Sequence, residues 1–209
     1  MNKPLILVGG GGHCKSVIEV AESAGYTILG ILDREIPTGE RVLGFKVLGN
    51  DDMIGPYLNK AEFLVTVGQI KSPSIRIRLN KMVKDAGGKL ATVIAPTAHV
   101  SKYATIGEGT VVMHQAVVNA GAQIGMGCIV NTFANIEHDV KLSDFCHVST
   151  GAMVNGEAEI GEGTFIGSQS VVNQCVKVCS MTVVASGSVV NKNITEAGVY
   201  AGNPIKRVK

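Results

Sequence analysis

The sequence predicts two joined domains: a small Rossmann-like α/β half domain over residues 1–90 and a parallel β-helix over residues 91–209. Three observations lead to this fold class. Ile, Val or Leu occupies every sixth position from Ile94 to Val190 without a break. The residue four positions after each of these anchors is small (Ala, Ser, Thr or Cys) in 14 of 17 hexads. Residues 1–90, in contrast, alternate short apolar runs with helical patterns.

The first half is predicted to alternate strands and helices. Apolar runs indicate strands, with a turn closing the third, and amphipathic patterns closed by glycines indicate helices. The expected strands span 5–10, 27–33, 44–52 and 62–68, and the expected helices span 13–25 and 74–88. Such an alternation predicts a small parallel sheet covered by helices, about half of a dinucleotide-binding fold. Residues 89–96 then lead into the repeat.

A period of six matches neither a 3.6-residue helix nor a simple alternating strand, so it indicates an architectural repeat. A longer period of three hexads is also present, since every third hexad tends to begin Ile-Gly and another set tends to begin Val-Asn. Three unlike hexads per cycle predict a three-sided prism of stacked coils with inward anchors. Positions separated by three hexads should then lie one above the other. Examples are Cys128 over Cys146 and an edge column at positions 119, 137, 155, 173 and 191.

Composition argues against several functions. The net charge is +2, aromatic residues make up 4% of the chain and tryptophan is absent, so neither nucleic acid nor a membrane is an expected partner. Residues 1–12 lack the long apolar region of a signal peptide. The five cysteines are an odd number without metal-ligand spacing, which favours a reduced, cytoplasmic protein. The nearest histidine pair, His138 and His147, is nine residues apart, unlike the five-residue spacing of γ-class carbonic anhydrases, so no metal is expected.

One candidate binding site is the glycine-rich turn GGGGHCKS at 9–16, between the first strand and first helix. Glycines allow close approach of the backbone, and a helix N-terminus offers free N–H groups to a phosphate. Asp33 ends the next strand, where a ribose-binding acid is expected. The alternative is a tight turn that only serves helix–strand packing.

The hexad IEHDVK at 136–141 interrupts the Val-Asn pattern of its own face. His138 lies between Glu137 and Asp139, so it is a candidate general base with a carboxylate to orient it. The alternative is a solvent-facing corner histidine. A nucleophilic Cys–His pair is less favoured, because Cys146 falls on an inward small-residue position.

Over nearly its whole length the chain resembles the bacterial nucleotide-sugar acyltransferases of the hexapeptide-repeat superfamily. The resemblance rests on the GxGGH start, the ILD strand end, VNTxAxIEHD at 130–139, HVSxGA at 147–152 and AGNPxKxV at 201–208. That group contains UDP-4-amino-sugar N-acetyltransferases and sialic-acid O-acetyltransferases. The resemblance implies a left-handed β-helix, acetyl-CoA as co-substrate and a homotrimer with active sites shared between subunits.

The resemblance also implies roles for individual residues. His138 would be the catalytic base and Asp139 its acidic partner. The nucleotide-sugar site would comprise Gly10, Gly12, His13, Asp33, Arg34, Gly68 and Asn131. The acetyl-CoA site would comprise His147, Gly156, Ser168, Ser186 and Lys206. Gln69 and Arg34 depart from the family pattern, which leaves the nucleotide and the sugar open.

The implied reaction is direct acetyl transfer from acetyl-CoA to the amine of a nucleotide-linked amino sugar in bacterial glycan biosynthesis, with backbone N–H groups near Gly156 stabilising the oxyanion. Two alternatives remain at this point. One is O-acetylation of a sialic acid or another sugar hydroxyl, which the same histidine could catalyse. The other is a non-catalytic protein that binds a nucleotide sugar.

Overall fold

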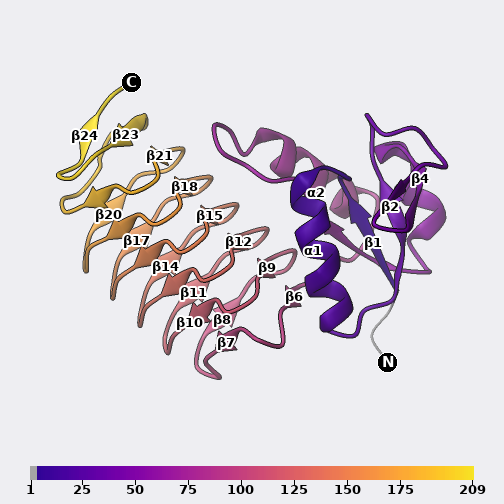
Figure 1. Cartoon of the computed structure of the whole chain (residues 1–209), viewed down its shortest axis with the longest axis horizontal. Helices are drawn as coiled ribbons and strands as arrows, with labels where there is room; N and C mark the ends of the chain where they lie inside the picture. Colours follow the sequence, from indigo (N-terminus) through magenta and orange to yellow (C-terminus); the bar gives the residue numbers. More distant parts are fainter. Residues whose placement is uncertain (1–3) are drawn as a thin grey trace.

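The computed structural model describes residues 4–209, and in it a small α/β domain packs against one end of a long prism of stacked coils (Figure 1). Residues 1–3, where the opening segment and the first predicted domain begin, lie outside the described residues. Strands β1 to β5 and helices α1 and α2 form the α/β domain. Strands β6 to β24 form the prism and its C-terminal hairpin.

The α/β domain contains a five-stranded sheet in the order β3-β4-β2-β1-β5. Its central strands are parallel and almost fully buried, as expected for a sheet covered by helices. The elements are β1 (Leu5–Val8), α1 (Gly12–Ser23), β2 (Ile28–Leu32), β3 (Arg41–Val42), β4 (Phe45–Gly49), η1 (Asp51–Tyr57), β5 (Glu62–Val65) and α2 (Ser74–Asp85).

Two of these elements were not predicted. Strand β3 is two residues long and pairs antiparallel with β4, so the sheet is mixed at one edge. The 3₁₀ helix η1 begins where the Asn50 side chain accepts a hydrogen bond from the Asp52 N–H, and it contains Pro56. Both elements are too short for a periodic pattern, which explains why the sequence does not indicate them.

The prism has three faces of parallel strands, and from Val93 to Val190 paired strands lie three hexads apart along the chain. Face 1 comprises β6 (Val93–Ile94), β9 (Val111–Val112), β12 (Ile129–Val130), β15 (His147–Val148), β18 (Phe165–Ile166), β21 (Val183–Val184), β23 (Val199–Ala201) and the antiparallel β24 (Lys206–Arg207). Face 2 comprises β7 (His99–Val100), β10 (Val117–Val118), β13 (Asn135–Ile136), β16 (Met153–Val154), β19 (Val171–Val172) and β22 (Val189–Val190). Face 3 comprises β8 (Thr105–Ile106), β11 (Gln123–Ile124), β14 (Lys141–Leu142), β17 (Glu159–Ile160) and β20 (Lys177–Val178).

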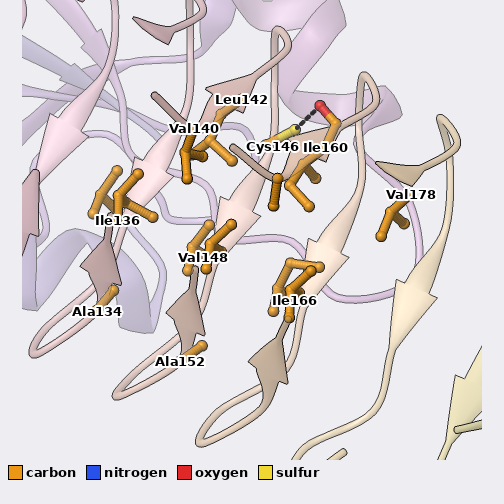
Figure 2. Packing of buried hydrophobic residues seen from close by; sticks show 14 of the residues in the cluster. Ala134, Ile136, Val140, Leu142, Cys146, Val148, Ala152, Ile160, Ile166 and Val178 are labelled. Atoms are coloured by element: carbon orange, nitrogen blue, oxygen red, sulfur yellow. Dashed lines mark hydrogen bonds between the residues drawn. The ribbon is translucent and has the colours of Figure 1, made fainter. Parts of the chain in front are cut away.

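The six-residue anchors fill the interior of the prism, as the repeat predicts. From Val112 to Val190 every anchor is buried, and anchors of successive coils stack in columns (Figure 2). The predicted columns are also present. The Asn119 side chain donates to Glu137 over 2.9 Å, and Cys128 and Cys146 lie in the same buried cluster of the prism.

The outward residue of each strand gives the three faces different surfaces. On face 1, Val93, Val111 and Ile129 pack into the core of the α/β domain. Face 3 carries only polar outward residues, including a ladder in which Glu159 pairs with both Lys141 and Lys177. Face 2 presents a mostly apolar row comprising Val117, Met153, Val171 and Val189.

The corners require tight turns. In every hexad from Ile106 to Val184 the residue three positions after the anchor has a positive φ. Close contact between coils also requires some residues without a Cβ. A Cβ on Gly161 would lie 2.4 Å from the backbone nitrogen of Ser180 in the next coil.

Gly161→Ala should therefore lower the free energy of unfolding by about 1–3 kcal/mol, because backbone atoms of the next coil must move. Gly55→Ala is the control, since its Cβ would meet open space, and its effect should stay within about 0.5 kcal/mol. Urea unfolding followed by circular dichroism compares the two variants. Equal midpoints for both would contradict the stacking argument.

Candidate active site

His138 and Asp139 lie together at the corner between faces 2 and 3. The Nδ1 atom of His138 is 3.0 Å from Oδ2 of Asp139, and both side chains are more than half exposed. The ionised carboxylate can only accept, so Nδ1 carries the proton, and Nε2 has a free lone pair when the ring is neutral. Asp139 is the left-handed residue of this corner, with φ of 58°. The corner geometry thus aims the carboxylate at the histidine.

The ring of His138 lies over Gly156 of the next coil. A Cβ at position 156 would be 2.6 Å from Nε2, so only glycine leaves room for the ring in this orientation. The next residue, Glu157, donates its N–H to the carbonyl of His138 over 3.0 Å. The structure therefore brings together His138, Asp139 and Gly156, three of the residues that the sequence singled out.

Carboxylates around His138 raise its pKa. The hydrogen bond to Asp139 is the largest cause, and the charges of Asp139, Glu137 and Glu157 act in the same direction. The Glu137 carboxylate is itself held, because Nδ2 of Asn119 and Nδ2 of Asn135 each lie 2.9 Å from one of its oxygens. A histidine with a raised pKa and an unprotonated Nε2 is suited to accept a proton near neutral pH.

The glycine-rich turn lines a cavity of about 510 Å³ in the α/β domain. Gly11, Gly12 and His13 contribute the start of α1. The remaining wall comes from Asp33, Arg34, Glu35, Asp51, Thr66, Val67, Gly68, Ile75, Arg78 and Leu79, with Gly9 at the end of β1. The free N–H groups of a helix N-terminus, together with two arginines, make this cavity suitable for phosphates.

Asp33 and Gly10 have structural roles at this cavity. Oδ2 of Asp33 accepts the Gly10 N–H over 2.5 Å, and Oδ1 accepts the N–H groups of Glu35 and Ile36. The carboxylate thus ties the glycine turn to the loop after β2. Gly10 lines a neighbouring hollow rather than this cavity. A second hollow, of about 640 Å³, shares Asp33, Arg34 and Glu35 with the cavity.

The rings of His13, which is partly buried, and His147, which is buried, lie near one another at the contact between the domains, with centroids 6.3 Å apart. Burial and the positive charge of Arg76 lower the pKa of His13 to about 4 and that of His147 to about 3. Both rings are therefore neutral at physiological pH. His147 projects outward from β15 on face 1 but is only 6% exposed, and the Phe165 ring meets it edge-on at 5.1 Å.

Both ring nitrogens of His147 are bonded within the chain. Nδ1 lies 2.9 Å from the main-chain oxygen of Gln69, and Nε2 lies 3.2 Å from Nδ2 of Asn131. Gln69 and Arg76, in turn, are almost fully buried against the prism. No role was assigned to Arg76 from the sequence. The helical spacing offered a signal, because Arg76 lies four residues before Asn80 and seven before Val83, and all three are on the buried face of α2.

The remaining predicted residues lie away from His138. Asn131, Ser168 and Ser186 occupy turns at the corner between faces 1 and 2, where Ser168 is bonded to Ser149 over 2.9 Å. Lys206 is exposed on β24, beside the end of the prism. In one chain, face 2 therefore separates the predicted catalytic residues from most of the predicted acetyl-CoA residues.

Two further observations concern residues 4–209 as a whole. None of the helices in this part of the chain is long and apolar enough to cross a membrane. Within the same residues, His, Cys, Asp and Glu side chains do not gather in threes that could hold a metal ion.

Comparisons with known proteins cover both domains. The family described as PglD N-terminal domain matches residues 4–83. A curated relative, UDP-N-acetylbacillosamine N-acetyltransferase of Bacillus subtilis, is 33% identical over an alignment of 121 positions, and the match covers 53% of this chain and 51% of that protein. The match thus spans about half the length of that relative.

Solved structures match along nearly the full chain. The acetyltransferase domain of PglB from Neisseria gonorrhoeae, in complex with acetyl coenzyme A, is 36% identical with a TM-score of 0.93, covering 100% of both chains. PerB from Caulobacter crescentus, in complex with CoA and GDP-perosamine, is 30% identical with a TM-score of 0.92, covering 99% of this chain and 97% of that one. The likeness confirms the predicted Rossmann-like domain followed by a left-handed parallel β-helix. This chain belongs to the hexapeptide-repeat sugar acyltransferase family.

Proposed function

We propose that the protein transfers the acetyl group of acetyl-CoA to the amine of a nucleotide-linked amino sugar, with His138 as general base. The observation that carries the proposal is the His138–Asp139 pair, in which Nε2 keeps its lone pair above Gly156. Relatives of the family support these two substrates. The name of one relative contains a UDP-linked sugar, one structure holds acetyl coenzyme A, and another holds CoA and GDP-perosamine. The Bacillus subtilis relative and a perosamine enzyme from Caulobacter crescentus are named N-acetyltransferases, which favours an amine over a hydroxyl acceptor.

The reaction forms a C–N bond and breaks a C–S bond. The amine nitrogen of the sugar attacks the thioester carbonyl carbon, and Nε2 of His138 takes a proton from that nitrogen. The Asp139 carboxylate stabilises the imidazolium that results. The main-chain N–H of Gly156 would stabilise the negative charge on the carbonyl oxygen, since the N–H groups of Asn155 and Glu157 are already donated to Val172 and His138. Collapse of the tetrahedral intermediate releases CoA, whose sulfur accepts the proton.

The substrate sites follow the same proposal. The nucleotide would occupy the cavity around Gly12, His13, Arg34 and Gly68, with Gly10 and Asp33 holding its wall in place. Asn131 would lie beside the acceptor sugar. Acetyl-CoA would lie along the corner that carries Ser168 and Ser186, near His147, with Lys206 at its phosphates.

We also propose a homotrimer in which neighbouring subunits share each site. Two features support it. The predicted residues are divided between two corners of one chain, so a second copy is needed to bring both sets together. The mostly apolar outward row of face 2 is a surface that a neighbouring subunit could cover. A cytoplasmic location is proposed from the five free cysteines.

His138→Ala should lower kcat by at least about 10²-fold, because it removes the ring nitrogen that takes the proton from the amine. The assay supplies acetyl-CoA with UDP- and GDP-linked 4-amino sugars and detects released CoA. Sedimentation of the variant provides the control for folding and assembly. Turnover close to that of the unmodified protein would refute the assignment.

Asp139→Asn should move the acidic limb of the kcat/KM profile to lower pH. The Asp139 carboxylate raises the pKa of His138 by stabilising the protonated ring, so its removal lowers that pKa. The base form of His138 then persists to lower pH, although the rate at the plateau falls because the imidazolium is less stabilised. An unchanged inflection would show that another group controls this limb.

Sedimentation equilibrium should give three times the mass of one chain. Met153→Asp should shift the protein toward monomers and remove activity, because it places a charge in the apolar row of face 2. Gln123→Asp, at an exposed outward position of face 3, is the matched control and should remain trimeric. A fully active monomer would contradict the shared site.

A further inference from the structure

A chain of buried hydrogen bonds runs from α2 through the domain boundary to Asn131. It begins at Arg76, which is 2% exposed and donates to the Gln69 side chain and to the carbonyls of Gly127 and Phe145. The Nε2 group of Gln69 donates to the carbonyl of Gly163 over 2.7 Å. Positions 127, 145 and 163 follow one another at intervals of three hexads, so Arg76 and Gln69 together bind one corner of three successive coils.

The main-chain carbonyl of Gln69, whose side chain is held by these bonds, is hydrogen-bonded to His147. The carbonyl oxygen can only accept, so the Nδ1 atom of His147, 2.9 Å away, must carry the proton. The Nε2 atom of His147 is then an acceptor. Burial and the nearby Arg76 charge lower the pKa of His147 to about 3, so the ring does not take a second proton at neutral pH.

The last bond of the chain orients the Asn131 amide. Oδ1 of Asn131 accepts the N–H of Thr132 over 2.8 Å, which leaves Nδ2 to face Nε2 of His147 at 3.2 Å. These two hydrogen bonds determine which of the two positions at the end of the Asn131 side chain is occupied by Oδ1 and which by Nδ2. One N–H of Nδ2 is used by His147, and the second is available to another acceptor.

We propose that Arg76 and Gln69 are positioning residues that fix the Nδ1–H tautomer of His147 and, through it, orient the Asn131 amide toward the bound sugar. This inference rests on the proposed function for the place of Asn131 beside the acceptor. Gly68, the neighbour of Gln69, lines the cavity of the α/β domain. The chain therefore connects the wall of the nucleotide-sugar cavity to the acceptor side of the prism.

Arg76 could also act only by joining the two domains. A second contact between the domains provides a control that separates this structural role from the positioning role. Lys84, also on α2, pairs with Glu108 of the prism at a half-exposed position and contacts none of the residues in the bond chain. Lys84→Met thus removes another contact between the domains without touching Gln69 or His147.

The first test reads the tautomer directly in the full-length protein. Histidine labelled with ¹⁵N and long-range ¹H–¹⁵N spectra distinguish a protonated Nδ1 from a protonated Nε2, and His147→Gln assigns the signal. The unmodified protein should show His147 as the Nδ1–H form. Arg76→Met and Gln69→Leu should give a mixture of tautomers, whereas Lys84→Met should leave the signal unchanged. An Nε2–H form in the unmodified protein would overturn the proposal, even if a variant fails to fold.

The second test is a double-mutant cycle. Gln69→Leu should lower kcat by up to about 10²-fold through misplacement of the Asn131 amide. In an Asn131→Ala background the same change should cost less than about twofold, since the group it positions is gone. Equal losses in both backgrounds would show that Gln69 acts independently of Asn131 and would overturn the proposal. If the unmodified protein transfers no acetyl group, the proposed function fails, and the tautomer spectra still decide the positioning role.

Discussion

The stacking of coils in a register of three hexads determines both the site around His138 and the contact between the two domains. From Val93 to Val190 the paired strands of the prism are parallel and lie three hexads apart, so residues at that spacing share an environment. Residues at equivalent positions of successive coils therefore stack in columns. Such columns are formed by the inward anchors, by the corner residues with positive φ and by the corner carbonyls. His138 lies over Gly156 because these positions are separated by one full coil, and the absence of a Cβ there leaves space for the ring.

The contact between the two domains follows from the same register. A buried guanidinium is costly unless its N–H groups are satisfied, and Arg76 has main-chain carbonyls rather than a carboxylate as most of its partners. A regular corner supplies such carbonyls at fixed spacing. Burial lowers the pKa of Arg76 only to about 10, so the group stays cationic at neutral pH. Its charge in turn helps to keep His13 and His147 neutral.

Much of the fold could be predicted because its pattern is local. The six-residue period gave the prism and its inward residues, and the broken pattern at IEHDVK pointed to His138 and Asp139, which the structure places in contact. Other features depend on contacts between distant segments. The ribose-binding role of Asp33 stays a prediction, and the sequence did not indicate that its carboxylate also accepts three main-chain N–H groups of its own domain. The bonds of Arg76 reach up to 69 residues along the chain, which no local pattern reveals.

The two ends of the prism differ from its middle. At one end the α/β domain covers the first coils of face 1, and a bridge joins Phe63 to Leu90 just before the prism begins. At the other, β24 turns back antiparallel on β23, where a further coil would otherwise continue in parallel. A stack of identical coils with open ends could pair end to end with other molecules and grow into fibrils. The reversed hairpin and the attached domain thus make both ends of face 1 differ from the open strand edges through which such fibrils would grow.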